Sequence, residues 1–146
     1  MSNAIPEIQD AKCLLVFGYN AADSHPIVAR HILKAKARGA KLIVCDPRMV
    51  ETARIADQWL PLNNGSNMAL VNAFANVLIT EGLYDKEYVA NYTEGFETFK
   101  ATVARYTPEY VEGITGLKAA DIRAAMCTYA ESPASMILWG MGVTQY

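Results

Sequence analysis

Two short runs of continuous apolar residues constrain the fold of this chain most strongly. They cover Lys12–Phe17 and Lys41–Cys45, and neither alternates between apolar and polar residues. Runs of this kind predict strands that are buried on both faces, as in a parallel sheet. The residues between them have a helical pattern, with Ser24 as the predicted N-cap and Gly39 as the predicted stop. The sequence therefore predicts a right-handed βαβ unit.

The rest of the chain continues the alternation of helices and short strands. The pattern predicts, in chain order, a short helix over Met49–Ala56, a strand over Gln58–Leu62, a long helix after the turn Asn63–Asn67, helices over Asp85–Asn91, Thr93–Arg105 and Thr107–Glu112, a helix over Lys118–Glu131 and a strand over Met136–Trp139. This order predicts an α/β fold with a doubly wound, Rossmann-like parallel sheet and helices on both faces. We expect one domain over residues 1–146, with a small helical insertion over residues 85–115.

The long helix is expected to bury its apolar side. That side comprises six residues: Met68, Leu70, Val71, Phe74, Val77 and Leu78. Their spacing is typical of an amphipathic helix that packs on a core.

Composition and charge exclude several functional classes. The chain has 146 residues, 52% of them hydrophobic, which is enough for the core of one domain. Its net charge is -2 and no basic run is present, which argues against nucleic-acid binding. No apolar stretch reaches the roughly 20 residues of a membrane helix. Because the start also lacks a signal-peptide pattern, a cytoplasmic location is expected.

Cysteine and histidine spacing predicts neither a metal ligand nor a catalytic residue in this chain. Cys13, Cys45 and Cys127 form no C-x-x-C pair, and each is expected to be a small buried apolar residue. His25 and His31 are too far apart to share one face of a helix, and are expected at the surface or at a helix cap. No serine or cysteine triad can be assembled.

The first candidate binding loop, Gly18–Pro26, follows the first predicted strand. It is no G-x-G-x-x-G fingerprint, because Asn20 and Asp23 stand where glycines are needed, and it lacks the lysine of a P-loop. A glycine followed by a helix N-terminus can still present backbone N–H groups to a pyrophosphate. A tight turn capped by Ser24 explains the same residues equally well.

Asp46 and Arg48 follow the second predicted strand. An acidic side chain at this place in doubly wound folds accepts hydrogen bonds from ribose hydroxyls. The guanidinium of Arg48 suits a phosphate or a stacked base. The alternative is an Asp-Pro turn with a surface pair between Arg48 and Glu51, and spacing alone favours that alternative.

Two further loops are candidates. In Gly65–Asn67, Asn67 either caps the long helix or contacts a base edge. In Gly140–Gln145, the two glycines permit a close approach of a flat ligand, and Gln145 offers a donor and an acceptor; glycines that serve packing are the alternative.

A strand and a glycine loop this near Tyr146 suggest that the chain is a piece of a longer polypeptide. Ser2–Ala4 can be a tag remnant.

The loops resemble one known family when they are taken together. The matching motifs, in order, are Phe17-Gly18-Tyr19-Asn20, Asp23-Ser24-His25-Pro26, Cys45-Asp46-Pro47-Arg48, Glu51-Thr52-Ala53, Ala56-Asp57, Gly65-Ser66-Asn67-Met68-Ala69-Leu70, Ile114-Thr115-Gly116 and Trp139-Gly140-Met141-Gly142-Val143-Thr144-Gln145. This series, which covers nearly the whole chain, resembles the molybdopterin oxidoreductase (DMSO reductase) family. Within that family it is most similar to the catalytic α subunit of formate dehydrogenase.

The resemblance implies a function for the longer protein. It implies a molybdopterin guanine dinucleotide carrying Mo or W, oxidation of formate to CO2, and a 4Fe-4S cluster whose ligands lie outside this chain. The implied partners are the remaining domains of the same subunit and electron-transfer subunits.

The resemblance also assigns roles to residues. Gly18, Tyr19, Asn20, Asp23 and Ser24 would line the pyrophosphate and ribose of one guanine dinucleotide. Its nucleoside end would be held by Cys45, Asp46 and Arg48. The guanine or its sugar would lie against Gly65 and Asn67, and the pterin side near Met141, Gly142 and Gln145.

The chain departs from the family in ways that limit its chemistry. The N-terminal cysteine cluster, the metal-ligating cysteine or selenocysteine with its histidine, and the catalytic arginine have no counterpart. We therefore expect a cofactor-binding part without activity of its own. The alternatives are another molybdopterin oxidoreductase and a stand-alone nucleotide-binding or signalling module. A nicotinamide-dependent dehydrogenase is disfavoured by the missing glycine fingerprint, and a receiver domain by Gly18-Tyr19-Asn20 in place of an acidic pair.

Overall fold

The computed structural model describes residues 3–145, so Met1, Ser2 and Tyr146 lie outside the described part. The possible tag remnant is therefore described only from Asn3 onward. The chain forms two compact units. Within the described part, the first comprises residues 3–62 and 132–145, and the second comprises residues 63–131.

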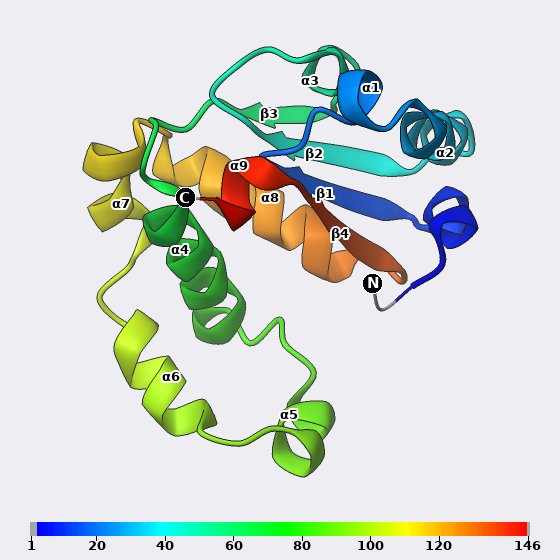
Figure 1. Cartoon of the computed structure of the whole chain (residues 1–146). Coiled ribbons are helices and arrows are strands. Elements are labelled where there is room, and N and C mark those ends of the chain that lie inside the picture. Colours follow the sequence, from blue (N-terminus) through cyan, green and yellow to red (C-terminus); the bar gives the residue numbers. More distant parts are fainter. Residues whose placement is uncertain (1–2, 146) are drawn as a thin grey trace. The chain divides into compact units, whose positions relative to one another are not determined.

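The first unit contains a four-stranded sheet in the order β3-β2-β1-β4 (Figure 1). Its strands are β1 (Cys13–Phe17), β2 (Lys41–Cys45), β3 (Gln58–Leu60) and β4 (Ser135–Trp139). All three strand pairs are parallel. All of β1, and β2 apart from Lys41, are buried, which the uninterrupted apolar runs predicted. The α/β class and the parallel sheet are thus confirmed.

Short helices accompany this sheet. They are η1 (Ile5–Asp10, a 3-10 helix), α1 (Ala21–Ser24), α2 (Pro26–Ala37), α3 (Glu51–Arg54) and α9 (Met141–Thr144). Side chains from η1, α2, β1 and β2 form one buried apolar cluster, which includes Ile8, Leu14, Val16, Ile32, Ala35, Leu42 and Val44. Gly39 follows α2 with a φ of 89°, which confirms the predicted stop.

The predicted first helix corresponds to α2, whose N-cap is His25 and not Ser24, which corrects the sequence interpretation. The short helix α1 lies within the predicted loop Gly18–Pro26. The two helices are separated at His25, whose φ of -144° and ψ of 69° are not helical. Pro26 explains the break, because the residue before a proline is disfavoured in the helical region. Ser24 is the last residue of α1 and not a cap; its hydroxyl donates to the carbonyl of Asn20 at 2.7 Å.

The third strand is present and short. It was predicted over Gln58–Leu62 and ends at Leu60, because Pro61 has no N–H with which to continue the ladder. The preceding helix is one turn long and is also shorter than predicted.

Asp57 joins the start of β3 to α2 and β2. Its Oδ2 accepts hydrogen bonds from the Lys36 ammonium and from the Leu42 backbone N–H, each at 2.7 Å. Burial of the carboxyl tends to raise the pKa of Asp57. The hydrogen bonds from Lys36 and Leu42, with the charges of Lys36 and Lys41, outweigh burial and hold the pKa below its usual range.

We predict that Asp57→Asn lowers the free energy of unfolding by about 1 kcal/mol at pH 7. A folded-state pKa below the unfolded value stabilises the fold above the unfolded pKa, about 3.9, and this contribution is lost as the pH falls through the folded pKa. Urea unfolding at pH 7, 5 and 3 should therefore show the two proteins converging at acid pH. The control is Asp10→Asn, which removes an exposed pair with Arg38. A difference independent of pH would contradict this role of Asp57.

The second unit is helical. Its helices are α4 (Asn67–Thr80), α5 (Lys86–Tyr92), α6 (Phe96–Val103), α7 (Pro108–Thr115) and α8 (Ala119–Glu131). Helix α4 contacts α6, α7 and α8. The helical insertion expected over residues 85–115 lies within this unit and stays a prediction. The single-domain organisation stays a prediction.

Of the three polar residues at which helices were predicted to begin in this unit, Asp85 and Thr107 act as N-caps and Thr93 does not. The carboxylate of Asp85 accepts from the Tyr88 N–H, and the hydroxyl of Thr107 accepts from the Tyr110 N–H. Helix α6 starts after Gly95, whose φ is 71°, and not at Thr93. The hydroxyl of Thr93 instead donates to the carbonyl of Val89, at the end of α5.

The predicted apolar side of α4 is only partly correct. Leu70, Phe74 and Val77 are buried, but Met68 and Val71 are exposed. Asn76 lies on the buried side in their place. The buried side of α4 therefore includes a polar residue and does not coincide with the apolar residues of the sequence pattern.

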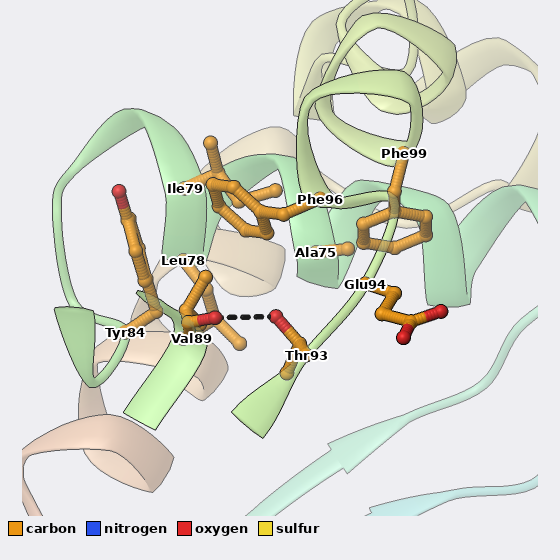
Figure 2. A pocket seen from close by; sticks show the side chains of 9 residues that line it. All are labelled: Ala75, Leu78, Ile79, Tyr84, Val89, Thr93, Glu94, Phe96 and Phe99. Atoms are coloured by element: carbon orange, nitrogen blue, oxygen red, sulfur yellow. Dashed lines mark hydrogen bonds between the residues drawn. The ribbon is translucent and has the colours of Figure 1, made fainter. Parts of the chain in front are cut away.

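A pocket of about 330 Å³ lies within the second unit (Figure 2). It is lined by Ala75, Leu78, Ile79, Tyr84, Val89, Thr93, Glu94, Phe96 and Phe99. The rings of Tyr84 and Phe96 are 5.1 Å apart. The lining is largely apolar and includes none of the predicted cofactor residues.

Candidate cofactor site

The order of the strands singles out one place on the sheet for a ligand. From β1 the chain proceeds to β2 and β3 on one side, and β4 then lies on the other side of β1. Open α/β sheets bind ligands beyond the carboxyl ends of the strands where the strand order reverses in this way. The loops that follow β1 and β4 meet this criterion, and both were candidates from the sequence.

The loop after β1 is held by its own hydrogen bonds. Gly18 adopts a φ of 55°, and its N–H donates to the carbonyl of Cys45 at 2.8 Å. The Asn20 side-chain amide donates to the Asp23 carboxylate at 2.5 Å. The Oδ1 atom of Asn20 is buried without a partner among the described residues. This oxygen is therefore an acceptor whose hydrogen-bonding capacity is unused among the described residues.

The aromatic ring of Tyr19 lies beside His25, with 5.5 Å between the ring centroids. Burial raises the pKa of Tyr19, so its phenol stays protonated at neutral pH. His25 was expected only as a surface or cap residue, and it does occupy the N-cap position of α2. The position of His25 directly before Pro26 was the sequence signal for its non-helical backbone.

The glycines after β4 pack directly on the loop after β1. The Gly142 N–H donates to the Gly18 carbonyl at 3.1 Å. A Cβ atom on Gly142 would lie 2.8 Å from the Gly18 oxygen, and one on Gly140 would lie 2.8 Å from Cδ2 of Tyr19. These positions exclude any side chain, so the two glycines serve the packing of one loop on the other. Contact between Gly142 and a ligand stays a prediction.

Met141 and Gln145 are the other candidates after β4. Met141 is the first residue of α9, and Gln145 occupies its C-cap position. Both side chains are exposed, so each is accessible to a ligand.

Asp46 and Arg48 form a turn at the end of β2. The Asp46 carboxylate is buried, and its Oδ1 accepts the Arg48 N–H at 2.9 Å. The Asp-Pro turn favoured by spacing is therefore present. A surface pair between Arg48 and Glu51 was expected with this turn. Glu51 pairs instead with Arg54, at 3.3 Å. The Arg48 side chain is 75% exposed, with Nε 3.8 Å from the Asp46 carboxylate, so its guanidinium can reach a phosphate.

Cys45 and Trp59 support this turn from within the sheet. Burial, and to a smaller extent the Asp46 charge, raises the pKa of Cys45, which keeps its thiol neutral. The indole N–H of Trp59 donates to the Asp46 carbonyl at 2.9 Å. Sequence reasoning missed Trp59. The available signal was a tryptophan in the predicted strand Gln58–Leu62, where Trp59 pairs with Val44 of β2.

Gly65 and Asn67 belong to the second unit, where they precede and begin α4. Gly65 has a φ of 82° and open space where a Cβ would lie. The N-cap position is occupied by Ser66, so Asn67 is not the cap that was considered. The Ser66 hydroxyl donates to the Asn63 carbonyl at 2.6 Å.

The remaining His and Cys residues of the described part lie apart from these loops or inside the core. Among residues 3–145 no three His, Cys, Asp or Glu side chains are placed to hold a metal ion. His31 is buried, with Nδ1 unpartnered, and so differs from the surface or cap position expected. Cys13 and Cys45 are buried as predicted, whereas Cys127 is only partly buried. No helix of the described part is long and apolar enough to cross a membrane.

A nucleotide cofactor fits the groups that remain. The unpartnered oxygen of Asn20 can accept from a base or a hydroxyl, and the exposed guanidinium of Arg48 can neutralise a phosphate. Both groups are placed by loops at the carboxyl edge of the sheet. An acceptor and a cation at this edge are compatible with a dinucleotide ligand.

Known proteins resemble this chain along its whole length. Formate dehydrogenase H of Escherichia coli is 60% identical over 146 residues, and the F420-dependent formate dehydrogenase subunit alpha of Methanocaldococcus jannaschii is 44% identical over 146 residues. The chain covers all of its own length in both matches but only 20% and 22% of the relatives.

A solved structure agrees with these similarities. Acetylene hydratase from Pelobacter acetylenicus superposes with a TM-score of 0.86 at 36% identity, over 94% of this chain and 20% of that one. The sequence profile described as molybdopterin oxidoreductase matches residues 1–146. Because this profile matches the full length of the chain, the chain belongs to the molybdopterin oxidoreductase family.

Proposed function

We propose that this chain is the part of a formate dehydrogenase α subunit that holds one molybdopterin guanine dinucleotide. The observation that carries the proposal is the 60% identity, along all 146 residues, to a protein named formate dehydrogenase H. The placement of the candidate loops at the reversal of strand order supports it.

Different residues would contact different parts of the cofactor. Asn20 would accept a hydrogen bond through its unpartnered oxygen, and Arg48 would pair with a phosphate. The Asp46 turn would meet the ribose, since Trp59 and the Arg48 N–H fix that turn. By resemblance, Gly65 and Asn67 would lie near the guanine, and Met141, Gly142 and Gln145 near the pterin. When bound, the cofactor supplies the metal that takes up the two electrons released as formate becomes CO2 and a proton.

The chain itself would bind and orient, and other parts of the protein would complete the reaction. The catalytic residues, the metal ligand and the 4Fe-4S cluster would come from the rest of the same polypeptide, and electron-transfer subunits would accept the electrons. We therefore expect no oxidation of formate by the isolated 146-residue chain in a dye-linked assay. Turnover by that chain would contradict this division of labour.

Guanine nucleotides are expected to stabilise the isolated chain. GDP carries the guanosine and pyrophosphate portion of the proposed cofactor. At 100 times its Kd a ligand stabilises the folded state by about 2.7 kcal/mol, or roughly 5 to 10 °C in Tm for a chain of this size. Thermal unfolding with GDP should show this shift, and Arg48→Ala should reduce it. Arg54→Ala is the matched control, since Arg54 is an exposed arginine paired with Glu51.

Other outcomes of this titration point elsewhere. A shift with NAD but not with GDP would favour a nicotinamide-dependent enzyme. No shift with millimolar GDP would contradict the residues assigned here. An equal loss of the shift in Arg48→Ala and Arg54→Ala would mean that general positive charge, and not Arg48, binds the phosphates.

A second substrate class is favoured by one observation. The solved structure that resembles this chain is named an acetylene hydratase, so the same fold is used in proteins named for different reactions. Assays of the full-length protein with formate and with acetylene distinguish the two. Hydration of acetylene without formate oxidation would retain the cofactor proposal and replace the substrate.

A further inference from the structure

Strand β4 has an open edge. Among the described residues it pairs with β1 alone, and it therefore borders the sheet. Its five residues, Ser135–Trp139, include neither a charge nor a proline. An edge of this kind is a ready template for another strand.

Two apolar side chains of β4 are more exposed than their partners on β1. Ile137 pairs with Leu15 and Trp139 pairs with Phe17, so each pair lies on one face of the sheet. Leu15 and Phe17 are 4% and 5% exposed, but Ile137 and Trp139 are 45% and 62% exposed. Strands of parallel sheets are normally buried on both faces. Ile137 and Trp139 are thus exposed apolar side chains on the border strand.

The backbone groups of the same two residues point away from β1. The Gly140 N–H donates to the Phe17 carbonyl, and the Ala134 carbonyl accepts from the Lys12 N–H. Backbone groups alternate in direction along a strand, so those of Ile137 and Trp139 lie on the opposite side from those of Ala134 and Gly140. Both residues therefore combine outward backbone groups with an exposed apolar side chain.

The opposite edge of the sheet has no such property. Strand β3 has three residues, its Leu60 is buried, and Pro61 follows directly. Short strands and prolines are the means by which proteins block an edge. The contrast indicates that β3 is a true border and that β4 is not.

We propose that a further strand, supplied by the same polypeptide outside residues 1–146, pairs in parallel with β4 and covers Ile137 and Trp139. The chain covers 20% of the length of formate dehydrogenase H, so the full-length protein has ample chain to supply it. Parallel pairing is favoured because every strand pair of this sheet is parallel. Two copies meeting at β4 about a two-fold axis would pair antiparallel. The proposal does not depend on the cofactor or the substrate.

Proline substitutions test the direction of the backbone groups. Ile137→Pro removes an N–H that points away from β1, whereas Leu138→Pro removes one that points toward β1. In the 146-residue chain, Ile137→Pro should lower the Tm by no more than about 3 °C and Leu138→Pro by more than about 8 °C. In the full-length gene product both should lower it to a similar extent. Tolerance of Ile137→Pro in the full-length protein would overturn the proposal.

Hydrogen exchange of the unmodified proteins gives a second test that does not require the variants to fold. The amides of Ile137 and Trp139 should exchange at least about 100-fold more slowly in the full-length protein than in the 146-residue chain. Equal exchange would overturn the proposal. So would a dimer of the full-length protein that Ile137→Pro converts to monomers, because a second copy would then occupy the edge.

Discussion

Replacing Gly18 with alanine is expected to lower the free energy of unfolding by about 3 kcal/mol. Two effects add. The φ of 55° disfavours any residue with a Cβ, at roughly 1 kcal/mol. The new Cβ would also lie 2.8 Å from the Gly142 carbonyl carbon and 3.0 Å from its Cα, where only backbone atoms can yield. Either the loop after β4 moves away or β1 is distorted.

The matched control for Gly18 is Gly39→Ala. Gly39 has a φ of 89° with no atom within 4 Å of the Cβ position, so it measures the backbone strain without the overlap. We expect Gly39→Ala to lower the free energy of unfolding, measured with urea, by about 1 kcal/mol. The excess at Gly18 measures the packing of the two loops. Equal effects at both positions would mean that the loops do not pack as closely as described.

The Gly18 variant also connects the fold to the proposed function. Because the overlap displaces the two loops at the reversal of strand order, stabilisation by GDP should weaken in Gly18→Ala and persist in Gly39→Ala. Thermal unfolding with and without GDP measures both. A GDP shift that survives in Gly18→Ala would separate the binding site from this loop contact.

Replacing Asn76 with alanine should destabilise the second unit by about 2 to 3 kcal/mol. Asn76 is buried in α4, and its amide donates to the carbonyls of Val103 and Ala104 at 3.1 and 3.3 Å. These carbonyls lie at the end of α6, where the last carbonyls of a helix need partners from outside it. The Val103 carbonyl also accepts the Tyr106 N–H at 2.9 Å. Without the amide both carbonyls lose a donor, and α6 loses this attachment to α4.

Urea unfolding followed by circular dichroism measures this effect. Hydrogen exchange should locate it, with faster exchange in α6 than in the wild-type chain. Asn72→Ala is the control, since Asn72 is one turn earlier on α4 and partly buried. It should change the free energy of unfolding by less than about 1 kcal/mol. An equal effect at Asn72 would show that Asn76 acts through helix propensity and not through its two hydrogen bonds.

Local pattern was sufficient for most of the elements. The apolar runs at β1 and β2 predicted their strands because a buried parallel strand needs no polar positions. Pro61 and Gly39 fixed the ends of β3 and α2 through the backbone geometry that each residue imposes. The start of α2 after His25 was also readable in principle, since the preference against helix before Pro26 is local.

Local pattern failed where a side chain had a partner far away in the sequence. Met68 and Val71 are apolar and exposed, while Asn76 is polar and buried, because the carbonyls at the end of α6 satisfy its amide. Trp59 was missed for the same reason. Its role depends on the carbonyl of Asp46, which becomes its neighbour only when β2 and β3 pair.

The candidate loops were chosen from the sequence because small, polar and glycine residues follow apolar strands. The sequence by itself determined the α/β class, the loops at the strand ends and the family resemblance, all of which depend on residues close together in the chain. Only the tertiary structure placed β4 beside β1, which brings Gly142 onto Gly18 and makes those glycines packing residues. Contacts between such distant segments depend on how the strands order in the sheet, and no short stretch of sequence encodes that order.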